Sequence, residues 1–200
     1  MQTTTAPADP QLRLRAAVHR GRFRDPSVFG WTAQVLIAVQ ALVQVVLGFT
    51  PQTGAQVFSV TANVTEPVFL ASAAAFLVWF HRCRVNAEAL APLGHRYTTG
   101  AAVGSWFVPV LMWWAPRRAV LDIWRSGGGT ADTRLIDAWW TAWLAKTVGF
   151  LVYLAVDPGG DPNALWTVVV NTVAAGLAIA VIGRVGRSQR ALLDAGPAPA

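Results

Sequence analysis

Long apolar blocks alternate along the chain with short polar stretches that are rich in Arg, Pro and Gly. A helix needs roughly 20 predominantly apolar residues to cross a bilayer, because the hydrocarbon layer is about 30 Å thick. Four blocks reach this length, and each predicts a membrane-spanning helix. The predicted spans are residues 28–49, 58–80, 138–156 and 164–183.

Proline marks the helix boundaries in this pattern. Asp25-Pro26 precedes the first span, and the same dipeptide recurs before the last. Such a pair favours a helix start, since the acidic side chain caps free N–H groups and proline lacks an N–H that the first turn does not use. Glu66-Pro67, in contrast, interrupts the second block.

A further apolar block, residues 103–115, is too short to span. It has thirteen residues with Pro109 in its middle, and as a helix it would be only about 20 Å long. With four spans, all fifteen Arg residues fall on one side of the membrane; with five, they split eight to seven. Because basic residues concentrate on the cytoplasmic side, we predict that both ends of this block lie there.

These elements predict an all-α fold: an integral membrane bundle of four transmembrane helices with a short re-entrant or interfacial helical segment. We expect residues 1–25 to form a basic cytoplasmic arm that is partly disordered, because its start is rich in Thr, Ala and Pro. Residues 26–190 form the bundle, with the interfacial or re-entrant segment at 103–125. Residues 191–200 are predicted to be a disordered cytoplasmic tail.

Composition agrees with a membrane protein and argues against nucleic acid as a partner. Charged residues make up 13% of the chain and hydrophobic residues 54%, whereas an ordinary globular protein has about 25% charged residues. The net charge of +6 comes from Arg residues that flank the apolar blocks, as in membrane proteins. Fifteen Arg against one Lys is typical of a GC-rich bacterial genome. We therefore expect a multi-pass protein of the bacterial cytoplasmic (inner) membrane, with both termini in the cytoplasm.

An ordered set of aromatic and polar residues extends over about residues 68–190. It consists of Trp79-Phe80-His81-Arg82, Asn86-Ala87, Leu90, Trp106-Phe107-Val108-Pro109, Trp114, Pro116, Ile123-Trp124, Trp139-Trp140 and Gln189. This set resembles a family of small four-span bacterial membrane proteins, frequent in actinobacteria, that is catalogued as a domain of unknown function. Met112 and Arg117 depart from the family pattern. The resemblance implies the topology and no activity.

Trp and Arg concentrate between residues 106 and 125. Trp prefers the membrane interface, and Arg near an anionic surface contributes about 1 kcal/mol. A helix after Pro116 would be amphipathic, with Arg118 and Arg125 on its polar face. The segment is thus a candidate surface for anionic lipid headgroups or for a membrane or cytoplasmic protein partner, or else a hairpin that only packs the end of the bundle. The candidate residues are Trp106, Trp113, Trp114, Arg117, Arg118, Trp124 and Arg125.

Four of the polar residues inside the predicted spans are candidates for a functional role, namely Gln40, Gln44, Lys146 and Asn171. A lysine at that depth costs roughly 2.5–3.5 kcal/mol, so it requires a partner or a route to water. These residues either hold helices together or line a permeation path. Gly176 and Ala180 form a small-residue pair that predicts a close helix contact.

The leading functional prediction is a non-enzymatic membrane scaffold or accessory protein that uses its Trp/Arg face. The alternative is a small-solute or ion transporter or channel that uses Lys146 and the other intramembrane polar residues; a lipid-modifying enzyme comes third. No catalytic motif or phosphate loop is recognisable, and we expect no cofactor. The spacing of His81, His95, Glu88 and Cys83 matches no metal-ligand pattern, and a single cysteine excludes an intramolecular disulfide.

Overall fold

The computed structural model describes residues 23–50, 54–91, 97–129, 132–156 and 165–194. Within these residues the chain forms helices and no strand. Most of the predicted arm at 1–25, and residues 195–200 of the predicted tail, lie outside the described residues. The described chain divides into two compact units.

We call the first unit the bundle unit; it contains residues 27–79 and 133–183. The second is the arginine-rich unit, made of residues 23–26, 80–132 and 184–194 where described. Among the described arginines only Arg134, the first residue of its helix, belongs to the bundle unit.

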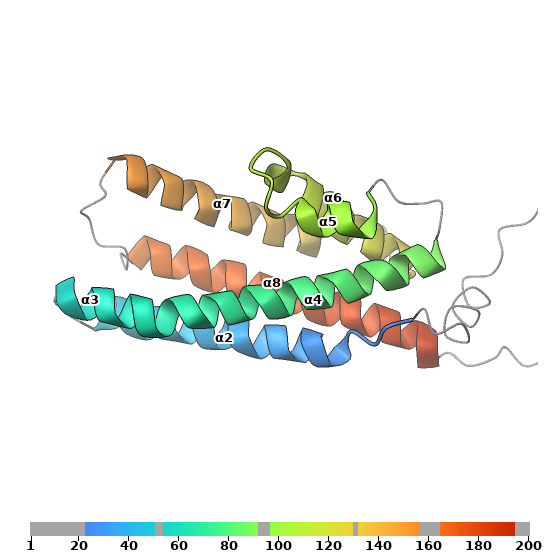
Figure 1. Cartoon of the computed structure of the whole chain (residues 1–200), viewed down its shortest axis with the longest axis horizontal. Coiled ribbons are helices and arrows are strands. Elements are labelled where there is room, and N and C mark those ends of the chain that lie inside the picture. Colours follow the sequence, from blue (N-terminus) through green and yellow to red (C-terminus); the bar gives the residue numbers. More distant parts are fainter. Residues whose placement is uncertain (1–22, 51–53, 92–96, 130–131, 157–164, 195–200) are drawn as a thin grey trace, which may run out of the picture. The chain divides into compact units, whose positions relative to one another are not determined.

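Four helices in the described part of the chain are long and apolar enough to cross a membrane (Figure 1). The first, third and fourth are α2 (Ser27–Phe49), α7 (Arg134–Val156) and α8 (Leu165–Asp194). The second consists of α3 (Gly54–Val60), η1 (Thr61–Thr65) and α4 (Glu66–Leu90) in direct succession. The predicted all-α fold with four transmembrane helices is confirmed. Beyond the predicted span ends at 80 and 183, α4 and α8 continue as helices into the arginine-rich unit.

The second span is not broken at Pro67 as its sequence suggested, but contains a widened turn just before it. η1 is a π-helix of five residues that ends at Thr65. Proline at position 67 provides no N–H for the carbonyl of Asn63, and its ring would clash with that carbonyl in a regular α-helix. A π-turn relieves this conflict by admitting an extra residue. The Asn63 side chain also donates a hydrogen bond to the Ser59 carbonyl, at 2.8 Å.

Helix contacts in the bundle unit rest on a glycine and a glutamine of α2. A Cβ at Gly30 would lie 3.0 Å from Cδ1 of Trp79, so only glycine lets the indole approach the α2 backbone this closely. Gln34 Nε2 donates a 2.9 Å hydrogen bond to the Ile179 carbonyl of α8. Such polar contacts between spans contribute about 0.6–2 kcal/mol. These two contacts join α2 to α4 and to α8.

The close helix contact predicted at the small-residue pair Gly176 and Ala180 is wrong among the described residues of this chain. Both residues are exposed, and a Cβ at Gly176 would meet nothing within 4 Å. Aromatic residues provide contacts instead. Phe76 lies 5.5 Å from Trp79 and 6.3 Å from Trp139 between ring centroids.

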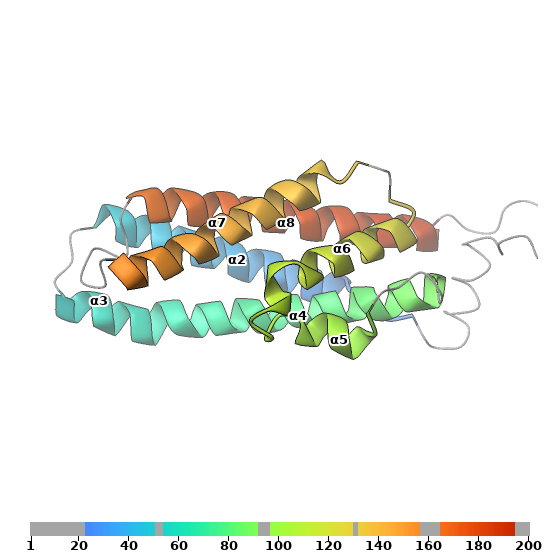
Figure 2. The ribbon, with the colours of Figure 1, turned by 90° about the horizontal axis from the view of Figure 1, so that it is seen from above.

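The arginine-rich unit contains α5 (Thr99–Gly104), η2 (Leu111–Trp113) and α6 (Ala115–Ser126) (Figure 2). The apolar block at 103–115 is therefore divided among short elements and forms no long helix, in agreement with its exclusion from the spans. α5 is capped by Thr98, whose hydroxyl accepts a 3.3 Å hydrogen bond from the Ala101 N–H.

α6 has the amphipathic character that its sequence predicted. Val120, Leu121 and Ile123 are buried, whereas Arg118 and Arg125 are exposed. The helix ends in three glycines. Gly128 has a φ of +76°, and a Cβ at Gly129 would lie 2.3 Å from the Trp124 ring, so both positions require glycine.

Candidate functional site

The four polar residues predicted inside the spans come together in the bundle unit. Gln40 and Gln44 of α2, Lys146 of α7 and Asn171 of α8 all line one partly open cavity of about 440 Å³. Small-molecule sites typically have volumes of roughly 300–1,000 Å³. The other lining residues are Leu47, Thr65, Glu66, Phe69, Phe150, Tyr153, Trp166, Thr167, Val168 and Val170.

The periodicity of the helices explains why these residues meet. Residues three and four positions apart lie on the same face of an α-helix. Gln40 and Gln44 are related in this way on α2, as are Lys146, Phe150 and Tyr153 on α7. Each span therefore presents one stripe of its surface to the cavity.

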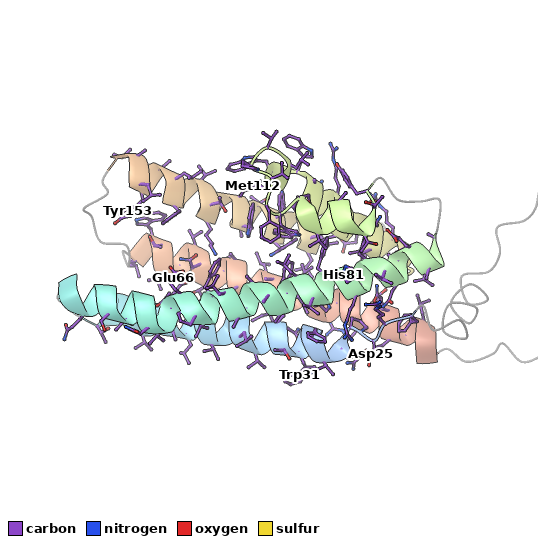
Figure 3. All side chains as sticks on the ribbon, viewed as in Figure 1. Asp25, Trp31, Glu66, His81, Met112 and Tyr153 are labelled. Carbon is purple, nitrogen blue, oxygen red and sulfur yellow. The ribbon has the colours of Figure 1, made fainter. Side chains whose placement is uncertain are left out.

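The cavity lies in one half of the bundle unit. Its lining comes from the second half of α2 and of α7 and from the first turns of α4 and α8. Lys146 precedes the end of α7 at Val156 by ten residues, which is about 15 Å along the helix. Glu66 and Tyr153, labelled in Figure 3, lie toward this end of the unit. The lysine is thus the deepest residue that α7 contributes.

Lys146 is half-buried, and its Nζ lies 6.0 Å from the centroid of the Phe69 ring. Within the described ranges, no carboxylate lies within 4.0 Å of this ammonium and no hydrogen bond satisfies it. Glu66 lines the same cavity and is exposed. The cavity therefore holds a cation and a carboxylate that do not pair with each other.

Two buried oxygens of the lining, Gln40 Oε1 and Thr65 Oγ1, have no hydrogen-bond partner among the described residues. A buried polar atom without a partner costs about 1–3 kcal/mol. The hydrogen bonds within the described chain thus leave part of the polar lining unsatisfied.

Aromatic side chains form much of the remaining wall, including Phe69, Phe150 and Trp166. A Cβ at Gly149 would lie 2.9 Å from Cζ3 of Trp166. Gly149 therefore allows the indole to lie against α7. This combination of apolar walls with a few polar groups is typical of small-molecule sites.

The seven candidate Trp and Arg residues of the arginine-rich unit differ in how deeply they are buried. Trp124 is only 6% exposed, and the Arg184 guanidinium lies 5.0 Å from its ring centroid. Trp106 packs edge-on against Phe80, with ring centroids 6.1 Å apart. Trp124 thus belongs to the packed interior of the unit, and Trp106 is half-buried. The remaining candidates are partly or fully exposed, namely Trp113, Trp114, Arg117, Arg118 and Arg125.

An exposed apolar loop lies between α5 and η2. Phe107 is 68% exposed and Val110 is 64% exposed. Apolar residues of this size at a protein surface indicate an interaction with a membrane or a partner when they are grouped. Neither Phe107 nor Val110 was among the residues predicted for this surface, which were tryptophans and arginines.

A buried polar network in the arginine-rich unit holds Arg24, which lies just before α2. The Asn86 side chain accepts from the Arg24 N–H at 2.8 Å and donates to the Arg24 carbonyl at 2.9 Å. It also donates to Gln189 Oε1 at 3.1 Å, and Gln189 Nε2 donates to the Cys83 carbonyl at 3.2 Å. Asn86 and Gln189, together with these backbone partners, form what we call the Asn86 network.

The sequence predicted four polar side chains of the cavity but not its threonine, glutamate and aromatic residues. Glu66 was interpreted only as an interruption of the second span, because its position opposite α7 depends on how the helices pack. In the described residues no group of three His, Cys, Asp or Glu side chains could hold a metal ion. Cys83, which follows the apolar part of α4, is buried.

The long apolar helices define the chain as a multi-pass, all-helical membrane protein. The family model of a domain of unknown function, DUF4328, matches residues 47–187, and the chain belongs to this family. The predicted membership in a family catalogued as a domain of unknown function is thereby confirmed. No curated protein and no solved structure matches the chain. The family description gives no activity, so function must be argued from the geometry.

Proposed function

We propose that this protein is a non-enzymatic transporter that binds a small polar solute inside the membrane. The observation that carries this proposal is the convergence of Gln40, Gln44, Lys146 and Asn171 on one cavity. A lysine inside a span costs roughly 2.5–3.5 kcal/mol, and a chain that only holds its helices together could avoid that cost. Intramembrane charges commonly mark the path of a substrate or ion.

The orientation follows from the distribution of arginine. All fifteen arginines lie outside the two short loops that join the first span to the second and the third to the fourth. By the positive-inside rule those loops face away from the cytoplasm, and both termini are cytoplasmic. The cavity lies in the half of the bundle unit nearest these loops, so a solute would enter it from the outer side of the cytoplasmic membrane.

The accessibility of introduced cysteines tests the proposal. In a Cys83→Ala background, Asn171→Cys places a thiol on the cavity wall, and Val173→Cys places one on an exposed apolar face of α8. A charged methanethiosulfonate reagent reacts with ionised thiols, so it requires water. Asn171→Cys should react in intact cells and, because a transporter opens to both sides, also in inverted vesicles. Val173→Cys should react in neither.

Two results would contradict the proposal. Equal, slow reaction of both cysteines would mean that the cavity holds no accessible water. Reaction of Asn171→Cys from one side only would exclude a transport route and leave a binding site that opens to that side alone.

The second candidate function is the scaffold or accessory role, and the exposed loop around Phe107 and Val110 favours it. Arg118 and Arg125 are exposed on α6 in the same unit. Apolar residues that enter a leaflet and arginines that meet anionic headgroups form an interfacial anchor. This surface would hold lipid, or a protein partner, at the cytoplasmic face.

Paired arginine variants test this second role. Arg118→Gln with Arg125→Gln should release anionic lipid from the purified protein in native mass spectrometry, because two arginines near an anionic surface contribute about 2 kcal/mol. Arg187→Gln with Arg190→Gln is the matched control, since it removes two exposed arginines of α8. Equal lipid retention in both double variants would refute a specific role for the α6 surface.

A further inference from the structure

The unpaired charges in the cavity identify the chemical class of its ligand. Lys146 and Glu66 both line the cavity, and their charged groups are farther apart than the 4.0 Å of an ion pair. Charges interact more strongly in a partly desolvated site than in water. A site with one cation and one carboxylate has no net charge, so the ligand that complements it also carries one charge of each sign.

The uncharged part of the lining adds two requirements. Gln44 and Asn171 carry amides that both donate and accept hydrogen bonds, and the Gln40 Oε1 acceptor has no partner among the described residues. Phe69 and Phe150 offer apolar wall. A ligand that satisfies these groups has several N–H donors, anionic oxygens and an apolar portion.

We propose that the cavity binds a zwitterion that carries a primary ammonium, an anionic oxygen group and an apolar substituent, the chemistry of an apolar α-amino acid. This inference rests on the proposed solute cavity and names its ligand class. The anionic group of the ligand lies toward Lys146, and its ammonium lies toward Glu66. The apolar substituent lies against the aromatic wall. A simple anion would pair with Lys146 and leave Glu66 without a partner, and a simple cation would do the reverse.

Three closely related compounds test the charge requirement. Phenylalanine is a zwitterion, N-acetylphenylalanine is an anion and phenylalaninamide is a cation, and all three have the same aromatic group. The protein, with Cys83→Ala and Thr167→Cys, is reconstituted in nanodiscs of phosphatidylglycerol. Thr167 lines the cavity, so a bound ligand should slow its reaction with the thiol reagent. Phenylalanine should protect at concentrations about 10-fold lower than either derivative, since each derivative loses one charged hydrogen bond.

Single substitutions connect the preference to the two charges. Lys146→Met should reduce the preference for phenylalanine over phenylalaninamide to about 1-fold, and Glu66→Gln should do the same for phenylalanine over N-acetylphenylalanine. Thr147→Val is the matched control, because Thr147 is next to Lys146 on α7, bonds to the Trp143 carbonyl and does not line the cavity. It should retain both preferences.

The same charge pattern occurs in the headgroup of phosphatidylethanolamine, and a second arm separates the two sources. If nanodiscs containing this lipid protect Thr167→Cys while free phenylalanine does not, the zwitterion is a lipid headgroup. Equal protection by phenylalanine and N-acetylphenylalanine in the unsubstituted cavity would overturn the inference, as would protection by neither zwitterion. If Asn171→Cys still reacts with the reagent in that case, the solute cavity stands and only the ligand class is wrong.

Discussion

Replacing Asn86 with alanine removes three hydrogen bonds of the arginine-rich unit at once. The lost bonds join the side chain to the N–H and carbonyl of Arg24 and to Gln189 Oε1. Asn86 is 0% exposed and Gln189 is 1% exposed, so water does not readily replace the bond between them. The backbone of Arg24 is nearer the surface and can regain water on one side.

The magnitude follows from these contacts. A net contribution of about 1 kcal/mol for each hydrogen bond, with a further penalty for the buried Gln189 oxygen, gives about 2–4 kcal/mol of lost stability. For a chain of this size, 1 kcal/mol corresponds to roughly 2–4 °C in Tm. Asn86→Ala should therefore lower the Tm by about 4–16 °C. Asn86→Asp should have at least as large an effect, because its buried carboxylate would face the Arg24 carbonyl and Gln189 Oε1, two acceptors that lose their donor.

Thermal unfolding of the purified protein in mild detergent, followed by tryptophan fluorescence, measures this difference. Asn63→Ala is the matched control, because the exposed Asn63 side chain makes one hydrogen bond, to the Ser59 carbonyl of its own helix. A Tm for Asn86→Ala within about 2 °C of that for Asn63→Ala would show that the network contributes little, and the reasoning would be refuted.

Three further predictions concern packing and topology. Gly30→Leu should lower the free energy of unfolding by about 1–3 kcal/mol, because the leucine side chain must displace the Trp79 indole. Gly176→Leu should leave the Tm unchanged, and equal Tm values for the two variants would contradict the packing of α2. A maleimide should label Cys83 only after denaturation, because the thiol is buried, and rapid labelling of the folded protein would contradict that burial. Reporter fusions after residues 94 and 128 should both give a cytoplasmic signal, and opposite signals would mean that the intervening segment spans.

The spans could be predicted from sequence because each is a self-contained signal of length and hydropathy. The exclusion of residues 103–115 was equally accessible, since it rests on length and on counting arginines. Residues at the membrane interface and residues in the packed interior were harder to tell apart from the sequence. Arg84 counted as one more flanking arginine, yet its side chain is fully buried and donates to the Tyr97 carbonyl. Trp124 was predicted to belong to the surface that binds lipid or a partner, but it is buried.

The cavity could be predicted only in part. The positions of Lys146 and Asn171 inside apolar blocks identify them as polar residues of the membrane. Which helix faces meet depends on helix rotation, and rotation is set by contacts such as Gly30 with Trp79. A glycine in an apolar block does not show by itself whether a neighbouring helix packs against it. Gly30 makes such a contact without having been predicted to, whereas Gly176 was predicted to make one and is exposed. Glu66 could have been predicted as well, because a charged residue inside an apolar block needs a polar environment.

The π-turn at Thr61–Thr65 has a consequence for how the family can vary in length. A π-turn holds one residue more than an α-turn, so loss of a single residue there would restore regular α geometry. The preceding residues Gly54–Val60 would keep their facing around the helix axis, because the widened turn takes up the extra residue. α4 would keep its facing, and with it Glu66 and Phe69 would keep their places in the cavity wall. The stretch is thus a point where relatives can gain or lose a residue and retain the lining below it, and an alignment of their sequences would show such gaps between positions 61 and 65.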